Sequence, residues 1–128
     1  MPITWTVEPE KQFVVLLPAD PSTIEEWRSA MSEILDSANA RPNLTMLVDR
    51  RETETLTAAF VSQMTRFFAE HQHDLLGSRS AIVVNDDAGF GMGRMTQMKA
   101  ALENPDSTIR VFRSYEDAVR WLTTGERA

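Results

Sequence analysis

Residues 81–93 read Ala-Ile-Val-Val-Asn-Asp-Asp-Ala-Gly-Phe-Gly-Met-Gly, so four consecutive apolar residues run directly into a polar, glycine-rich stretch. A short apolar run that is rich in β-branched side chains and ends in turn residues is typical of a strand buried on both faces. The residues that follow, as far as about Asn104 and before Pro105, have the length of a helix. We therefore predict a buried strand that leads into a helix, the repeating unit of an α/β fold.

The same alternation of apolar runs and helical stripes extends along the chain in both directions from this segment. Residues 3–8 alternate apolar and polar side chains, and we expect them to form a hairpin with residues 13–17 around a turn at Pro9 to Lys11. The buried strands are predicted at residues 13–17, 44–48, 81–84 and 108–112, and the helices at residues 24–38, 56–68, 94–104 and 115–122.

Strands separated by helices of this length imply parallel pairing through right-handed crossovers, with the N-terminal hairpin as the antiparallel exception. We predict an α/β fold made of a single domain, residues 1–128. Its central sheet is mixed but mostly parallel and has about five strands, with about four helices packed on it.

Capping residues predict where two of the helices begin. Ser22 and Glu25 have the spacing of a capping box, which starts the first helix directly after Ser22. Thr55 is the predicted N-cap of the second helix, whose inner face would include Ala59 and Phe60.

The bulk composition is that of an ordinary globular protein, with 42% hydrophobic and 25% charged residues in a chain of 128. The absence of cysteine excludes disulfides, thiolate metal sites and thiol nucleophiles. The longest apolar run, residues 13–17, is far shorter than the roughly 20 residues of a membrane span, and no basic stretch before an apolar run resembles a targeting segment. We therefore expect a cytoplasmic protein without a membrane span.

The formal net charge of −6 repels phosphate backbones over most of the surface. The densest basic spot, Arg50 and Arg51, is followed directly by Glu52 and Glu54. We expect no nucleic-acid partner.

The carboxyl ends of parallel strands meet at one edge of a sheet, where loops lead into helix N-termini and sites commonly form. Two loops of this chain would meet there, one after residue 48 and one after residue 84. The candidate ligand- or partner-binding residues in these loops are Asp49, Arg50, Arg51, Thr53, Thr55, Asp86, Gly89, Gly91, Gly93 and Arg94.

The glycine-rich segment at residues 88–93 has two interpretations. Glycines before a helix let bare amides approach an anion, helped by the positive end of the helix dipole. They also permit a tight turn and close packing of the helix on the sheet. The GxGxG spacing is neither a dinucleotide fingerprint nor a phosphate-binding P-loop. Met92, Met95 and Met98 in the following helix are typical of core packing, or of a flexible apolar pocket beneath that helix.

The residues predict neither catalysis nor a resident cofactor. Asp49, Asp86 and Asp87 resemble the clustered carboxylates of magnesium sites, but a solvated turn with an N-cap explains the adjacent pair more simply. His71 and His73 are two residues apart and would face different sides of a helix, so they do not make a metal pair. No serine occupies a glycine-flanked elbow before a helix. We expect no metal, no cofactor and no enzymatic activity.

Several local signatures resemble a known family. They are the N-terminal hairpin, Leu47-Val48-Asp49, residues 81–84 leading to Gly91-Met-Gly-Arg-Met95, and Val111-Phe112-Arg113 before Glu116-Asp-Ala-Val-Arg-Trp-Leu122. Together they resemble the STAS-like domains, and more narrowly the SpoIIAA-like (anti-sigma-factor-antagonist-like) branch, which is often grouped with lipid-transfer-type folds. The resemblance spans almost the whole chain and implies the arrangement of sheet and helices predicted above.

The resemblance also implies a regulatory role. Such proteins bind an anti-sigma kinase until a serine at the start of the helix after the middle strand is phosphorylated. The corresponding loop here, residues 49–56, contains no serine, so Thr53 or Thr55 would have to take its place. Glu52 and Glu54 put negative charge where the phosphate would lie. The switch therefore does not transfer residue by residue.

Two functions follow as expectations. The first is a non-catalytic regulatory or protein-interaction module, in which residues 50–55 and the helix after them face another protein. The alternative is a small-molecule or lipid-binding domain, with an apolar or anionic ligand in a pocket between the Gly89–Gly93 turn, the Met-rich helix and the sheet. Trp5, on an edge strand, is a candidate contact for a homodimer.

Overall fold

The computed structural model of the chain describes residues 3–8, 13–17, 23–37, 44–53, 56–103 and 107–124. Within these ranges strands and helices alternate as predicted, and the α/β fold with five strands and four helices is confirmed. The elements are β1 (Thr4–Glu8), β2 (Phe13–Leu17), α1 (Ile24–Asp36), β3 (Thr45–Asp49), α2 (Ala58–Glu70), β4 (Arg79–Val83), α3 (Asp87–Glu103), β5 (Thr108–Phe112) and α4 (Tyr115–Thr124).

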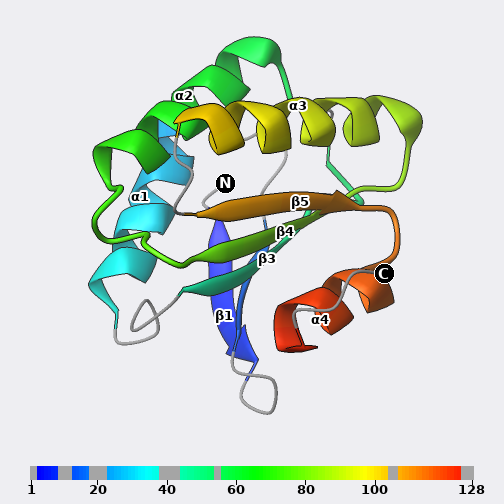
Figure 1. Cartoon of the computed structure of the whole chain (residues 1–128), viewed down its shortest axis with the longest axis horizontal. Coiled ribbons are helices and arrows are strands. Elements are labelled where there is room, and N and C mark those ends of the chain that lie inside the picture. Colours follow the sequence, from blue (N-terminus) through cyan, green and yellow to red (C-terminus); the bar gives the residue numbers. More distant parts are fainter. Residues whose placement is uncertain are drawn as a thin grey trace.

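The described strands form one sheet in which spatial order follows chain order, from β1 to β5. The hairpin β1–β2 is antiparallel and the other neighbours are parallel, as predicted. Because every crossover moves in the same direction across the sheet and crossovers are right-handed, α1, α2 and α3 lie on one face. The fourth helix, α4, follows the last strand and lies on the other face (Figure 1). The strand order never reverses, so this sheet lacks the switch-point crevice of doubly wound folds.

Strand side chains alternate between two hydrophobic clusters, one on each face of the sheet. On β3, for example, Met46 belongs to the cluster beneath α1, α2 and α3, whereas Leu47 belongs to the cluster beneath α4. In the larger cluster, Trp27 of α1 meets Phe67 and Phe68 of α2 edge-on, with ring centroids 5.2 and 5.8 Å apart. These aromatic contacts fix α1 against α2.

The predicted starts of the first two helices are wrong by one or two residues. The capping box of α1 is formed by Thr23 and Glu26, because the pattern Ser/Thr-x-x-Glu fits both Ser22 with Glu25 and the pair one residue later. The N-cap of α2 is Thr57, whose hydroxyl accepts a hydrogen bond from the Phe60 amide at 3.1 Å. The predicted caps Ser22 and Thr55 lie outside the described residues.

The inner face of α2 also differs from the prediction. Ala59, predicted on the inner face, is exposed, and Val61 is fully buried instead. Leu56 and Val61 occupy the positions of a hydrophobic staple on either side of the Thr57 cap, and both pack in the larger cluster.

The glycine-rich segment is a helix, so the prediction of a turn at Gly89–Gly93 is wrong. Helix α3 begins at Asp87, and Asp86 caps it by accepting hydrogen bonds from the amide of Gly89 (2.6 Å, through Oδ1) and from that of Phe90 (3.0 Å, through its carbonyl). These bonds and packing on the sheet outweigh the cost of glycine in a helix, about 1 kcal/mol for each residue. Among the described glycines, a positive φ occurs at Gly77, at 74°.

None of the helices in the described part of the chain has the length and apolar character needed to cross a membrane.

Candidate functional site

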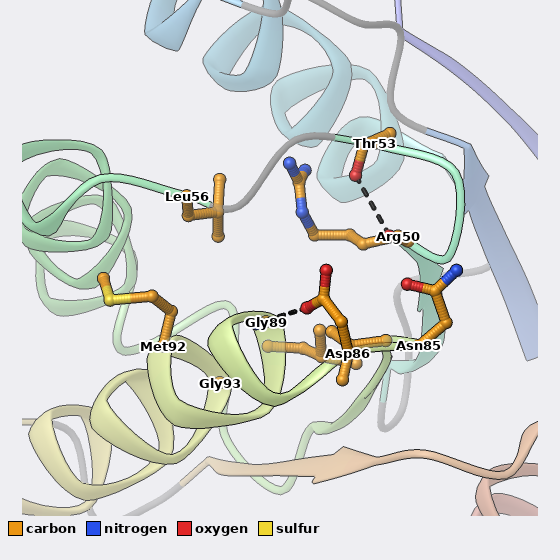
Figure 2. Close-up of a pocket in the computed structure, with 10 residues that line it drawn as sticks. Arg50, Thr53, Leu56, Asn85, Asp86, Gly89, Met92 and Gly93 are labelled. Atoms are coloured by element: carbon orange, nitrogen blue, oxygen red, sulfur yellow. Dashed lines mark hydrogen bonds between the residues drawn. The ribbon is translucent and has the colours of Figure 1, made fainter.

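The loops after β3 and β4 meet at the carboxyl edge of the sheet, as predicted. The two strands are parallel neighbours, with Asp49 opposite Val83, so the residues that follow each strand lie close together. A small recess opens between them (Figure 2). It is lined by Arg50, Thr53, Leu56, Ile82, Val84, Asn85, Asp86, Gly89, Met92 and Gly93.

One wall of the recess is the loop after β3. The amide of Arg50 donates to the carbonyl of Val83 at 2.8 Å, which extends the strand pairing by one residue. The hydroxyl of Thr53 donates to the carbonyl of Arg50 at 3.2 Å and closes the turn. Figure 2 shows the Arg50 side chain reaching across the recess towards Leu56. The loop is therefore held by its backbone, while the Arg50 side chain is presented to the recess.

The other wall is the start of α3. Asp86 faces Arg50 across the recess, but its Oδ1 is the acceptor that caps the helix at Gly89 (Figure 2). The simpler interpretation of Asp86, an N-cap, is therefore confirmed. Gly93 lies deeper, where α3 passes so close to Val111 of β5 that a Cβ on the glycine would overlap the valine side chain. Gly93 thus allows close packing of α3 on the sheet, and Gly89 and Gly93 both line the recess.

Asp49 and Arg51 lie on the opposite face of the sheet from Arg50, because successive side chains at a strand end point to opposite faces. The Arg51 guanidinium donates two hydrogen bonds to the Asp49 carboxylate, at 2.9 and 2.8 Å, and lies over the ring of Tyr115, 4.8 Å from its centroid. These side-chain hydrogen bonds from Arg51 lower the pKa of Asp49. The pair ties the loop to the start of α4 and does not enter the recess.

Asparagine at position 49 should remove the pH-dependent part of this contact. The pKa of Asp49 is lower in the folded chain than its ordinary value of 3.8. Ionised Asp49 therefore contributes fully to the free energy of unfolding when the pH is above 3.8, and this contribution is lost as the pH falls through the pKa of the folded state. We expect Asp49→Asn to cost a few tenths to about 1 kcal/mol at pH 7, as for partly exposed ion pairs. Urea unfolding of both proteins at pH 7 and pH 3 measures the difference, which should shrink at the lower pH. An unchanged difference would contradict this role.

Two further candidates, Gly91 and Arg94, are not among the residues that line the recess. Gly91 and Arg94 are exposed on the outer side of α3, and Thr55 lies outside the described residues. Core packing was the simpler prediction for Met95 and Met98, and it is wrong for both, because they are 38% and 62% exposed. Of the predicted residues, those brought together in the recess are Arg50, Thr53, Asp86, Gly89 and Gly93.

An apolar cavity adjoins the recess beneath α1, α2 and α3. It shares the lining residues Arg50, Leu56 and Ile82 with the recess, and it is otherwise lined by Trp27, Met46, Val48, Met64, Phe68, Ser80, Thr96 and Ile109. The recess has a free volume of about 20 Å³ and the cavity about 30 Å³, which is room for one or two water molecules in each. The predicted ligand pocket has the expected place, but its volume does not favour a bound organic molecule.

Sequence reasoning missed several residues that line the recess. Asn85 carried a usable signal, because it directly follows a predicted strand. Leu56 and Ile82 carried none, because their apolar spacing is the same as that of core residues, whereas Met92 was predicted either in the core or at an apolar pocket beneath its helix.

Among the described residues, no group of three or more His, Asp or Glu side chains is placed to hold a metal ion. The His71 ring stacks on Phe67, with centroids 4.0 Å apart, and its Nδ1 lies 3.0 Å from the Phe67 carbonyl oxygen. This histidine belongs to the C-terminal cap of α2.

Comparison with known proteins supports the fold. No protein-family model matches the sequence, and none of the curated proteins matches it. A solved structure is similar over 94% of both chains, with a TM-score of 0.62 and 17% sequence identity. It is an uncharacterized protein of the DUF3478 family from Shewanella loihica PV-4, described as having a SpoIIAA-like fold. The present chain is thus a single α/β domain, and its fold is SpoIIAA-like, as the sequence resemblance implied.

Proposed function

We propose that this chain is a non-catalytic regulatory domain that binds another protein through the rim of the recess. The observation that carries the proposal is that Asp49 and Asp86, two of the three acidic residues at these strand ends, are used in structural contacts, while the third, Asp87, pairs with Arg113. Asp86 caps α3, and Asp49 is held by two hydrogen bonds from Arg51. A general acid or base needs a positioned group within reach of a substrate proton, and these two carboxylates are already engaged elsewhere.

The shape of the edge also supports a protein partner over a small ligand. The recess holds about one water molecule, so a partner would contact its rim without filling a deep pocket. The rim presents a cation from one loop and polar groups from the other, Arg50 against Asn85 and Asp86, on backbones fixed by hydrogen bonds. Arginine on a rigid loop is a common anchor of protein interfaces. The SpoIIAA-like fold, shared with regulatory domains, supports the same assignment.

Reversing the charge of Arg50 tests this proposal. The Arg50→Glu variant keeps the backbone bond to Val83, so the loop should retain its shape. Wild type and the variant are each used as bait in lysate of the native cells, and the captured proteins are quantified by mass spectrometry. For at least one partner that wild type captures saturably, we expect the amount captured by the variant to be about tenfold or more lower.

The matched control is Arg120→Glu, which makes the same charge change on α4, on the other face of the sheet. It should capture the partner as wild type does. Equal recovery of every partner by wild type and by Arg50→Glu would contradict the proposed binding surface. Arg51 is a poor choice for this test, because its replacement would release the contacts to Asp49 and Tyr115.

A further inference from the structure

Charge is segregated in this chain. Residues 56–69 and 88–102, which make up most of α2 and α3, contain no Asp or Glu but do contain Arg66, Arg94 and Lys99. The other ten Lys and Arg residues and all 19 Asp and Glu residues lie elsewhere, so the rest of the chain carries −9. Over their full bounds α2 and α3 are neutral, because Glu70, Asp87 and Glu103 lie at the helix ends, and only the stretches between these ends are basic on an otherwise acidic protein.

The outer side of α3 carries an apolar seam. Its residues follow one another at alternating spacings of three and four, and all of them are exposed; they are Ala88, Gly91, Met95, Met98 and Leu102. Of the six large hydrophobic side chains that are exposed among the described residues, three belong to this set, and Leu102 is 85% exposed. Single exposed hydrophobics are ordinary, but a row of them on one helix marks a contact surface. We call these five residues the α3 seam.

The spacing of the α3 seam is that of helices that pair along their length. Positions three and four apart keep apolar side chains facing one neighbouring helix, as at the a and d positions of a heptad. The inner side of the same helix is already used, because Gly93, Thr96 and Ala100 are buried against the sheet. The geometry of α3 thus provides one site for one additional helix, and its small residues at the N-terminal end allow close approach.

Basic side chains flank the two methionines of the seam, one on each side, whereas Asp87, at the preceding g position, pairs with Arg113. With Met95 at an a position and Met98 at a d position, Arg94 takes a g position and Lys99 an e position. Lys99 is fixed on the side towards α2, where its ammonium donates to the hydroxyl of Ser62 at 2.9 Å. Arg94 is exposed on the opposite side. Charges at e and g positions select the partner of a paired helix.

This charge pattern disfavours two other occupants. In a parallel pair of α3 helices from two copies, Arg94 of one copy would face Lys99 of the other. In an antiparallel pair, Arg94 would face Arg94 and Lys99 would face Lys99, so like charges meet in both cases. The five positions of the seam carry no Trp or Tyr to anchor in a lipid interface, and the −9 on the rest of the chain is repelled by anionic lipid.

We propose that the α3 seam docks one helix of another protein, with apolar residues at its a and d positions and Asp or Glu at its e and g positions. The surface faces outward from the sheet and is distinct from the recess, so this proposal goes beyond the proposed function and either can fail alone.

The test uses two synthetic peptides of about three heptads with Leu at every a and d position. One has Glu at every e and g position, which keeps it from pairing with itself, and the other has Lys there. We expect fluorescence anisotropy with the full chain to show that the Glu peptide binds about tenfold or more tightly than the Lys peptide. Arg94→Glu combined with Lys99→Glu should reverse that preference, whereas Arg120→Glu and Arg50→Glu should leave it unchanged.

A second variant distinguishes loss of the binding surface from misfolding of the charge-reversed protein. Met98 is 62% exposed, so Met98→Glu should keep the thermal melt of wild type and abolish binding of the Glu peptide. Equal binding of both peptides, or no binding of either, would overturn the proposal. Met98-dependent binding to phosphatidylglycerol vesicles without peptide binding, or a Met98-dependent dimer in sedimentation, would replace it with a membrane or a self-association surface.

Discussion

Trp121→Ala is expected to lower the free energy of unfolding by about 3–5 kcal/mol, the range measured when a large aromatic is removed from a core. Among the described elements, α4 is the helix that covers its face of the sheet, and Trp121 is its largest buried side chain, 5% exposed. The indole packs on Phe112 with ring centroids 5.7 Å apart. Its loss would leave a void in a small cluster that has no second helix to close it.

Two arginines make position 121 less tolerant of substitution than the burial of Trp121 alone suggests. The guanidinium groups of Arg79 and Arg110 lie over the indole, 5.6 and 5.7 Å from its centroid. Arg79 also donates to the carbonyl oxygens of Trp121 and Leu122, at 3.0 and 2.7 Å, and so satisfies the C-terminal end of α4. Without the indole, both cations lose a packing partner.

Urea unfolding followed by circular dichroism measures the effect of Trp121→Ala. The control is Leu102→Ala, which removes an exposed apolar side chain and should change stability by less than about 0.5 kcal/mol. A loss below about 1 kcal/mol for Trp121→Ala would show that α4 is not held by this cluster.

Gly93→Ala and Gly91→Ala are expected to change stability in opposite directions, although both lie in α3 two residues apart. A Cβ on Gly93 would overlap Val111, and overpacking of this kind costs about 1–3 kcal/mol, partly offset by the better helix propensity of alanine. A Cβ on Gly91 meets no atom within 4 Å, so that variant should gain about 0.5–1 kcal/mol.

The two variants control for each other, because the gain in helix propensity is common to both. A double-mutant cycle sharpens the result: Val111→Ala should cost less in the Gly93→Ala background than in wild type, since it removes the overlapping methyl groups. Thermal or urea unfolding of wild type, the two glycine variants, Val111→Ala and the double variant measures these differences. Stabilisation by both single substitutions would mean that α3 does not approach β5 as closely as described.

The order of the elements could be predicted from the sequence because its signals are local. Apolar runs such as residues 44–48, followed by helical stripes, determine the alternation, and the handedness of crossovers then determines which face each helix covers. The first residue of each helix was harder to predict from the sequence. Ser22 with Glu25 and Thr23 with Glu26 satisfy the same capping pattern, so the sequence alone did not distinguish them.

Glycine positions show where local preference was overruled. Three glycines within five residues favour a turn, yet these residues lie in a helix that Asp86 caps. Position 93 is a glycine because Val111 leaves no room there for a side chain. The deciding contact with Val111 joins residues far apart in the chain and has no local signature.

The sequence by itself determined that this is an alternating α/β chain without cysteine and that the loops after residues 48 and 84 meet at one edge of the sheet. Tertiary structure alone decided which side chains share that edge. Arg50 enters the recess while Arg51 turns to Asp49 and Tyr115, because side chains at a strand end alternate between faces and only one face carries α4. It also decided that Met98 and Leu102 are exposed, because the side of α3 that packs on the sheet depends on residues brought together only by folding.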